Sequence, residues 1–404
     1  MAEKKNAFYP WIVLIIICLG GFIPNYTQYQ LSPLAPQLIQ SFKLSTSEFA
    51  SIFSSVAIPA IFFSLVAGLL VDKFGIKRII GVGFIIAAIG TVWRIWSDSY
   101  ITLFASMLLT GFGITFLNAN AAKVVGSWFP PEKVGSRTGI FLSASTLGMT
   151  VGTGTTALLS IQSAYRISAA LSVIFVVLWF LFIKNPEDVN PDDRLEEKNK
   201  VNVLHSLKVV LKSRTVWLTG ICLMFILGCN VVISSFLPTA LGQRGLDSVT
   251  AGMYAAFVTG GSLIGCLFAP VLSERVGKNR PVMMFFALVS AAGTAFSWLA
   301  PVGVLLGLCL CITGIALGGL MPLLMSIPIQ LKEIGPGYAG TAGGVTATLQ
   351  LLGAVLIPTY IIAPIAGQNM NLFFILGAVC MLCVFLFVFT LPELGKGKGK
   401  REMV

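Results

Sequence analysis

Twelve apolar runs, each about 18 residues or longer, follow one another along the 404-residue chain, and a helix of that length crosses the hydrocarbon core of a bilayer. Charged residues make up only 11% of the chain, whereas soluble proteins carry about 25%. A segment in lipid must satisfy its own backbone hydrogen bonds, as a helix does. The sequence therefore predicts an all-α membrane protein with 12 transmembrane helices. The expected spans lie near residues 10–38, 46–71, 78–96, 100–126, 134–161, 166–184, 214–242, 248–272, 279–299, 303–328, 337–363 and 370–392.

Lysine and arginine are concentrated on alternate loops. One side of the predicted membrane carries Lys77, Arg78 and much of the Lys184–Arg214 segment, while the other side carries few basic residues, such as Lys43 and Arg166. Because basic loops stay in the cytoplasm, we expect both termini on the cytoplasmic side of a bacterial inner membrane. The net charge of +11 is then a topology signal, and no nucleic-acid partner is expected.

A short loop occurs twice, as Gly68–Arg78 and as Pro270–Arg280. In each copy an acid, a glycine and a closing base keep the same spacing, and glycine permits the sharp turn that joins two long helices. The matched positions, each pair 202 residues apart, are Asp72 and Glu274, Gly75 and Gly277, and Arg78 and Arg280. A repeat at fixed spacing indicates two homologous halves.

The halves are expected as two pseudo-symmetric six-helix bundles, residues 1–185 and residues 214–404 with its basic tail. Residues 186–213 would form a cytoplasmic linker between them. Within that linker, apolar residues from Val203 to Leu211 recur at helical spacing beside Lys208 and Lys212. This pattern predicts a short amphipathic helix at the membrane surface, although a plain linker remains an equal alternative.

The duplicated loop, the six-plus-six plan and the linker resemble the major facilitator superfamily. That resemblance implies a solute site near the middle of the membrane, between halves that rock around it. It also implies that the loop residues Gly68, Asp72, Gly75, Arg78, Glu274, Gly277 and Arg280 act as a cytoplasmic latch. Further strings are similar to the cyanate/nitroimidazole porters and, more distantly, to the nitrate/nitrite and oxalate/formate porters. These strings are Trp93–Trp96, Thr110–Asn118, Trp128–Gly139 and Phe236–Pro238.

The sequence departs from these relatives at charged positions. Nitrate porters of this kind clamp the anion with arginines in spans two and eight, and both spans lack arginine here. The oxalate exchanger type needs a basic residue in span eleven, which is also absent. Met107 stands where many proton-coupled members carry arginine, and Met149 follows Gly148 where drug antiporters carry proline.

No acid lies clearly at mid-membrane, which favours facilitated diffusion, exchange, or a proton carried with the solute. The eight cysteines lie within apolar runs, and Cys380 and Cys383 form a CxxC pair surrounded by hydrocarbon side chains. Packing is therefore the better account of them, and the one histidine, His205, lies in the linker. We expect no metal, no cofactor and no enzymatic activity.

Arg94 lies 16 residues after Arg78, which is about 24 Å along a helix, near the outer edge of the hydrocarbon core. One reading is an interfacial arginine that extends to the membrane surface between Trp93 and Trp96. The other reading is an anion-attracting group at the outer gate.

Uncharged polar side chains in the spans are the candidate solute ligands, because amides in hydrocarbon face a wet cavity or another helix. Hydrogen bonding between helices is the alternative for each of them. The candidates are Asn25, Tyr26, Gln28 and Tyr29 in span one, Asn118 in span four, Ser145 in span five, Asn230 and Ser234 in span seven, Tyr254 in span eight and Gln350 in span eleven, with Arg94 at the gate.

Small residues allow close backbone approach of spans that must slide during rocking. The glycines expected in this role include Gly111, Gly113, Gly148, Gly152 and Gly154 in spans four and five, and Gly314, Gly318, Gly319, Gly340, Gly343 and Gly344 in spans ten and eleven.

Together these features predict a monomeric transporter, secondary active or facilitative, that moves a small polar solute by alternating access. The solute is expected to be an organic or inorganic anion or a zwitterion. Efflux of amphipathic compounds is an alternative, and a receptor that binds a solute without moving it is a further one.

Overall fold

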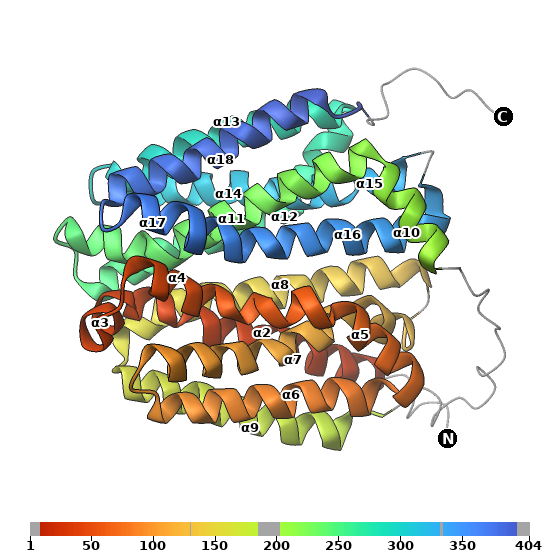
Figure 1. Cartoon of the computed structure of the whole chain (residues 1–404), viewed down its shortest axis with the longest axis horizontal. Coiled ribbons are helices and arrows are strands. Elements are labelled where there is room, and N and C mark those ends of the chain that lie inside the picture. The colour runs from red at the N-terminus through yellow and green to blue at the C-terminus, as the bar shows by residue number, and fades with distance from the viewer. Residues whose placement is uncertain (1–8, 130, 185–202, 332–333, 394–404) are drawn as a thin grey trace. The chain divides into compact units, whose positions relative to one another are not determined.

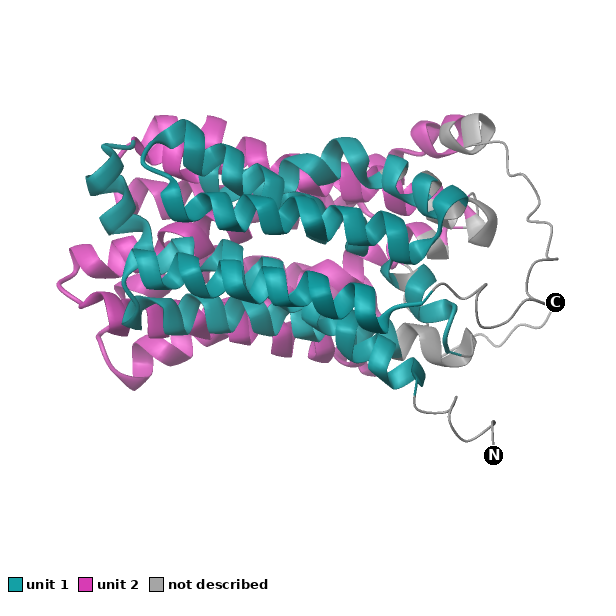
Figure 2. Cartoon of the chain, turned by 90° about the horizontal axis from the view of Figure 1, so that it is seen from below, with its two compact units in different colours: residues 1–44, 51–199 teal, residues 45–50, 200–404 magenta. Residues whose placement is uncertain are grey.

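The computed structural model describes residues 9–129, 131–184, 203–331 and 334–393. Every regular element in this part of the chain is helical (Figure 1). The chain divides into two compact units, shown in separate colours in Figure 2. Unit 1 comprises residues 1–44 and 51–199, and unit 2 comprises residues 45–50 and 200–404. The boundaries expected from the sequence, at 185 and 214, stay a prediction because most of the segment between them lies outside the described residues.

Unit 1 holds the helices of the first half of the chain, and residues 45–50 at the start of α4 group with unit 2. The helices are α2 (Tyr9–Tyr29), α3 (Leu31–Phe42), α4 (Thr46–Ser54), η1 (Ser55–Ala57), α5 (Ile58–Phe74), α6 (Ile76–Trp93), η2 (Arg94–Trp96), α7 (Tyr100–Gly126), α8 (Pro131–Thr155), η3 (Thr156–Leu158) and α9 (Ile161–Phe182).

Unit 2 holds the helices of the second half, including a six-residue π-helix, η7, that follows α16. They are α10 (Val203–Lys212), α11 (Arg214–Gln243), α12 (Ser248–Val276), α13 (Asn279–Phe296), η6 (Ser297–Leu299), α14 (Val304–Met325), α15 (Ile327–Gln330), α16 (Gly335–Leu356), η7 (Ile357–Ile362), α17 (Ala363–Ala366) and α18 (Met370–Thr390).

Eleven helical segments within the described residues are long and apolar enough to cross a membrane. The sequence predicts twelve, and the one that does not meet this test is the fifth span. That span is present as α8, a helix of 25 residues rich in glycine, serine and threonine. Its low hydropathy agrees with its position against α2 inside unit 1, where neighbouring helices rather than lipid cover its polar side chains.

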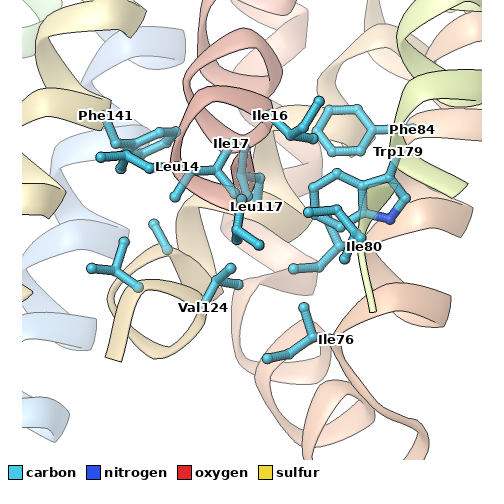
Figure 3. Close-up of a cluster of buried hydrophobic side chains, with 14 of the residues drawn as sticks. Leu14, Ile16, Ile17, Ile76, Ile80, Phe84, Leu117, Val124, Phe141 and Trp179 are labelled. Carbon is cyan, nitrogen blue, oxygen red and sulfur yellow. The ribbon is translucent and has the colours of Figure 1, made fainter. Parts of the chain in front are cut away.

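The core of unit 1 is a cluster of buried aliphatic and aromatic side chains (Figure 3). Leu14 and Ile17 of α2 meet Phe84 of α6, and Trp179 of α9 closes the cluster. The Trp179 indole also donates a hydrogen bond of 2.9 Å to the Lys77 carbonyl oxygen. Burial of the apolar ring together with a satisfied N–H fixes α9 against the start of α6.

In unit 2, α12 and α14 approach each other through glycines on both helices. A Cβ atom at Gly314 would lie 2.0 Å from the Val258 carbonyl oxygen, and one at Gly265 would lie 2.1 Å from the Ile315 carbonyl oxygen. Only hydrogen fits at these positions, as in other close helix pairs in membranes. The sequence also predicts close helix packing at Gly343 and Gly344. A Cβ atom at either residue would meet nothing within 4 Å, so these two glycines do not lie at a close helix contact within unit 2.

Both copies of the repeated loop turn at a glycine with positive φ. Gly75 alone separates α5 from α6, with φ 88° and ψ 156°. Gly277 caps α12 with φ 72° and ψ 11°. The first conformation is nearly exclusive to glycine, whereas asparagine also visits the left-handed conformation of the second. Backbone geometry therefore requires glycine at position 75 and favours it at position 277.

We expect Gly75→Ala to lower stability by about 1–3 kcal/mol, because alanine cannot adopt the Gly75 backbone without strain. Gly277→Asn should cost less, under about 1 kcal/mol. The measurement is the thermal unfolding midpoint of the purified protein in detergent. Gly68→Ala is the matched control, because a Cβ there would meet nothing within 4 Å. Equal midpoints for the Gly75 and Gly68 variants would contradict the strain argument.

The other predicted latch residues have different environments. Arg78 and Glu274 are exposed, and the side chain of Asp72 lies outside the described part of the structure. Arg280 packs its guanidinium 4.7 Å from the Phe389 ring centroid and donates to the Phe389 carbonyl oxygen. The Glu393 carboxylate accepts a 2.8 Å hydrogen bond from the Asn279 backbone N–H. In unit 2, the end of α18 therefore holds the start of α13.

The amphipathic segment forms α10, as its spacing predicts. Val210 of this helix is fully buried against Val216 of α11 and Ala342 of α16, while Lys208 and Lys212 are exposed. Its apolar face is thus used for packing on unit 2.

Candidate functional site

Asn25 lies in the C-terminal half of α2, where α2 packs on α8. Its side-chain amide donates a 2.8 Å hydrogen bond to the Gly21 carbonyl oxygen of its own helix. A Cβ at Gly21 would lie 2.3 Å from the Ser145 hydroxyl oxygen of α8. The structure therefore brings Asn25 and Ser145 to the same seam, with both side chains buried. One Asn25 N–H and the amide oxygen remain to bind other groups.

The neighbouring candidates of α2 contact different helices. Tyr26 is buried and its ring stacks on Phe22 at 6.0 Å. The Gln28 amide donates 2.9 Å to the Phe53 carbonyl oxygen of α4. Tyr29 is buried with its ring edge on Phe53, at a centroid distance of 5.3 Å. Gln28 and Tyr29 thus fix the C-terminal end of α2 against α4.

Asn230 of α11 occupies in unit 2 the position that Asn25 has in unit 1, since each is the seventeenth residue of its helix. Pro33 and Pro238 keep the same spacing, eight residues after each asparagine. The Asn230 amide oxygen accepts a 3.5 Å hydrogen bond from the Ser234 hydroxyl. Unlike Asn25, Asn230 is only half-buried.

Gln350 of α16 does not lie at the same depth along the helices as Asn230 of α11. A Cβ at Gly353 would lie 2.0 Å from the Met224 carbonyl oxygen, so Gln350 lies level with about residue 221 of α11. Asn230 is then about 13 Å further along that helix. The Gln350 amide instead approaches the Met321 sulfur of α14 at 3.9 Å.

Asn118 and Tyr254 lie apart from the other candidates. Asn118 is exposed on α7. Because an unpaired amide in hydrocarbon costs free energy, the exposed side of α7 at Asn118 is better suited to a polar environment than to lipid. The Tyr254 hydroxyl donates to the Gly303 carbonyl oxygen at 3.3 Å and accepts from the Gly303 N–H at 3.1 Å. Tyr254 therefore anchors the loop before α14 within unit 2.

Arg94 is buried with 0% of its surface exposed, so it does not extend to the membrane surface as one of the two sequence readings requires. It forms part of the short helix η2 and points into unit 1. Its Nη1 donates 2.9 Å to the Thr27 carbonyl oxygen and 3.4 Å to the Met107 sulfur. Its Nη2 donates 2.8 Å to the Gln30 amide oxygen and 2.6 Å to the Ser168 hydroxyl.

The Tyr165 ring covers the guanidinium of Arg94, with Cζ 4.3 Å from the ring centroid. Gln30 is fully buried and also donates 3.2 Å to the Ala164 carbonyl oxygen. Three buried atoms of this cluster have no hydrogen-bond partner within the described chain: Arg94 Nε, Thr27 Oγ1 and the Tyr165 hydroxyl. We call Arg94, Thr27, Gln30, Tyr165 and Ser168 the arginine cluster.

Sequence reasoning singled out Arg94 but missed the other members of the arginine cluster. One signal was available, since an arginine in a span needs polar partners on neighbouring helices. Gln30 interrupts the first apolar run of the sequence. Tyr165 directly precedes the sixth apolar run, and Ser168 lies within that run, three residues later. The described residues contain no group of three or more His, Cys, Asp or Glu side chains placed to hold a metal ion.

With eleven candidate membrane spans among its described residues, the chain is a multi-pass membrane protein. The family model described as "Major Facilitator Superfamily" matches residues 11–358. The chain belongs to the Major Facilitator Superfamily.

Several relatives are similar over most of their length. The hexuronate transporter of Bacillus subtilis is 24% identical over 69% of this chain and 70% of its own. The probable sulfoacetate transporter SauU of Cupriavidus necator is 24% identical over 83% of each chain. The nitrite extrusion protein of Bacillus subtilis is 25% identical over 81% of this chain and 80% of its own.

Two solved structures share the fold. The nucleoside transporter NupG has a TM-score of 0.72 at 17% identity, covering 96% of this chain and 99% of its own. A bacterial homologue of the human lysosomal transporter Spinster has a TM-score of 0.73 at 15% identity, covering 95% of each chain. At this identity the likeness concerns the fold alone.

Proposed function

We propose that this protein carries a small anion across a bacterial inner membrane by alternating access, with both termini in the cytoplasm. The solute is of the size of a hexuronate or smaller and bears a carboxylate, a sulfonate or an inorganic oxyanion. Asn25 and Asn230 supply hydrogen bonds to it, with Ser145 and Ser234 beside them.

The observation that carries the proposal is the matched placement of Asn25 and Asn230, each the seventeenth residue of a long candidate spanning helix, α2 in unit 1 and α11 in unit 2. An amide in hydrocarbon is costly unless it is hydrogen-bonded. Within the described part of the chain, the side chain of each asparagine makes one hydrogen bond, to Gly21 for Asn25 and to Ser234 for Asn230, so bonding capacity remains for a solute.

Two further facts favour an anion. The hexuronate, sulfoacetate and nitrite relatives are all named for anionic solutes. In addition, the acids within the candidate spans of the described chain are Glu48 and Glu274, both near span ends, whereas Arg94 is fully buried. The spans thus offer an anion a positive charge and little repulsion.

We expect Asn25→Ala and Asn230→Ala each to raise the KM for the anion about tenfold or more, because a hydrogen bond to a charged group contributes about 1.5–3 kcal/mol. Uptake of glucuronate, sulfoacetate and nitrite into proteoliposomes is the measurement. The solute is first chosen by the thermal shift that it gives the purified wild-type protein, about 2.7 kcal/mol of stabilisation at a hundredfold excess over Kd.

Asn120→Ala is the matched control, since Asn120 is also a buried asparagine bonded to its own helix, through the Phe116 carbonyl oxygen. It should leave the KM near the wild-type value. Unchanged KM values in both site variants would refute the pocket assignment, and a thermal shift with bulky amphipathic compounds alone would refute the anion.

A further inference from the structure

Among the described residues, no acid neutralises the buried charge of Arg94. Its guanidinium bonds or packs against uncharged groups there: Thr27, Gln30, Met107, Tyr165 and Ser168. The next acid along the chain, Asp98, is exposed in the loop before α7. Arginine keeps its proton in proteins, so unit 1 contains a fixed positive charge.

The arginine cluster holds this charge beside the solute-binding stretch of α2. Thr27, whose carbonyl oxygen is 2.9 Å from Arg94 Nη1, is two residues beyond Asn25. Gln30, 2.8 Å from Nη2, directly follows Tyr29. At a helical rise of about 1.5 Å per residue, the guanidinium lies on the order of 10 Å from Asn25. Four of its five N–H donors are occupied by protein, which prevents it from moving toward a solute.

A charge at that distance is sufficient to discriminate between solutes. At an effective dielectric constant of about 20, a unit charge about 10 Å away changes the binding constant of an anion by roughly fifteenfold. A neutral solute of the same shape experiences no such change. Several kcal/mol of desolvation cost oppose the burial of a charge without a counter-ion.

We propose that Arg94 is a specificity-determining residue that selects anions over neutral solutes of the same shape through its fixed charge, without contacting the solute. Gln30 and Thr27 are positioning residues that hold this charge against α2. This inference rests on the proposed function, because it assumes that the solute binds at Asn25.

Gln30→Glu tests the charge separately from the geometry. Glutamate retains an acceptor oxygen for Arg94 Nη2 and places a negative charge against the guanidinium. The probes are glucuronate and its neutral amide, glucuronamide, each measured as kcat/KM for uptake into proteoliposomes. We expect the ratio of glucuronate to glucuronamide to fall about tenfold or more. The new ion pair with Arg94 offsets the lost amide donor to the Ala164 carbonyl oxygen, so the variant should remain folded in detergent.

Two variants control the experiment. Gln243→Glu makes the same change at an exposed glutamine at the end of α11 in unit 2, where water and salt screen it, and it should retain the wild-type ratio. Arg94→Lys retains the charge and should retain most of the preference, even if its midpoint falls.

The outcomes separate the two proposals. A folded Gln30→Glu variant with the wild-type ratio overturns this inference and leaves the proposed anion transport standing. Loss of the preference in Arg94→Lys and its retention in Gln30→Glu would assign the effect to the shape of the guanidinium, which also overturns it. A wild-type protein that takes up none of glucuronate, sulfoacetate and nitrite overturns both proposals.

Discussion

Gly314→Val is expected to destabilise unit 2 by about 3 kcal/mol or more. Even the first added carbon would lie 2.0 Å from the Val258 carbonyl oxygen, and a backbone atom cannot rotate away as a side chain can. Relief requires α12 and α14 to separate, and the same displacement would disturb the contacts of Gly261, Gly265 and Gly318 along that seam. The measurement is the unfolding midpoint in detergent together with the yield of monodisperse protein.

Gly307→Val is the matched control, because Gly307 lies on the same helix and a Cβ there would be 3.5 Å from the Phe257 ring. That distance is an ordinary contact with a side chain that can move. If the two variants melt at the same temperature, close approach of the α12 and α14 backbones is not what stabilises unit 2.

Gln30→Leu should lower the stability of unit 1 by about 2–3 kcal/mol, because it leaves a charged donor without its acceptor in a buried site. The lost acceptor is the Gln30 amide oxygen, 2.8 Å from Arg94 Nη2. The amide donor to Ala164 is lost as well. The unfolding midpoint in detergent measures the effect, and Gln162→Leu at an exposed position should change it by less than about 0.5 kcal/mol.

A double-mutant cycle with Arg94→Met sharpens this prediction. Removal of Gln30 leaves Arg94 short of an acceptor, and removal of Arg94 leaves the Gln30 amide oxygen without a donor. The double variant removes both defects, so its loss should be smaller than the sum of the single losses by about 1.5–3 kcal/mol. Additive losses would show that the hydrogen bond contributes little.

The helical plan could be predicted from the sequence because hydrocarbon leaves the backbone few alternatives to a helix. The repeated loop was equally informative about the helix boundaries. Gly75 and Gly277 have positive φ, which glycine adopts most readily, so both turns could be located from the glycines in the sequence. The polar fifth span was placed correctly as a helix, yet only the structure shows that α2 covers it.

The candidate site was predicted less completely. Asn25 and Ser145 were singled out one by one, and the structure shows why they belong together, through the close approach of Gly21 to Ser145. The same reasoning placed Gln350 and Asn230 in one set of candidate solute ligands. In the structure, the contact of Gly353 with Met224 places the two side chains at different depths along α11 and α16. Helical spacing gives the face on which a residue lies, but the depth at which two helices meet depends on how their small residues interlock.

Arg94 illustrates what a column-by-column comparison of sequences misses. The family resemblance implies that many proton-coupled members carry an arginine where Met107 stands in this chain, and Arg94 Nη1 lies 3.4 Å from the Met107 sulfur. Such a comparison would record one arginine lost from α7 and an unrelated one gained thirteen residues earlier. In space, this chain has a guanidinium beside that position, supplied by a different helix. Homologues are therefore better grouped by where their buried charge lies than by which residue number carries it.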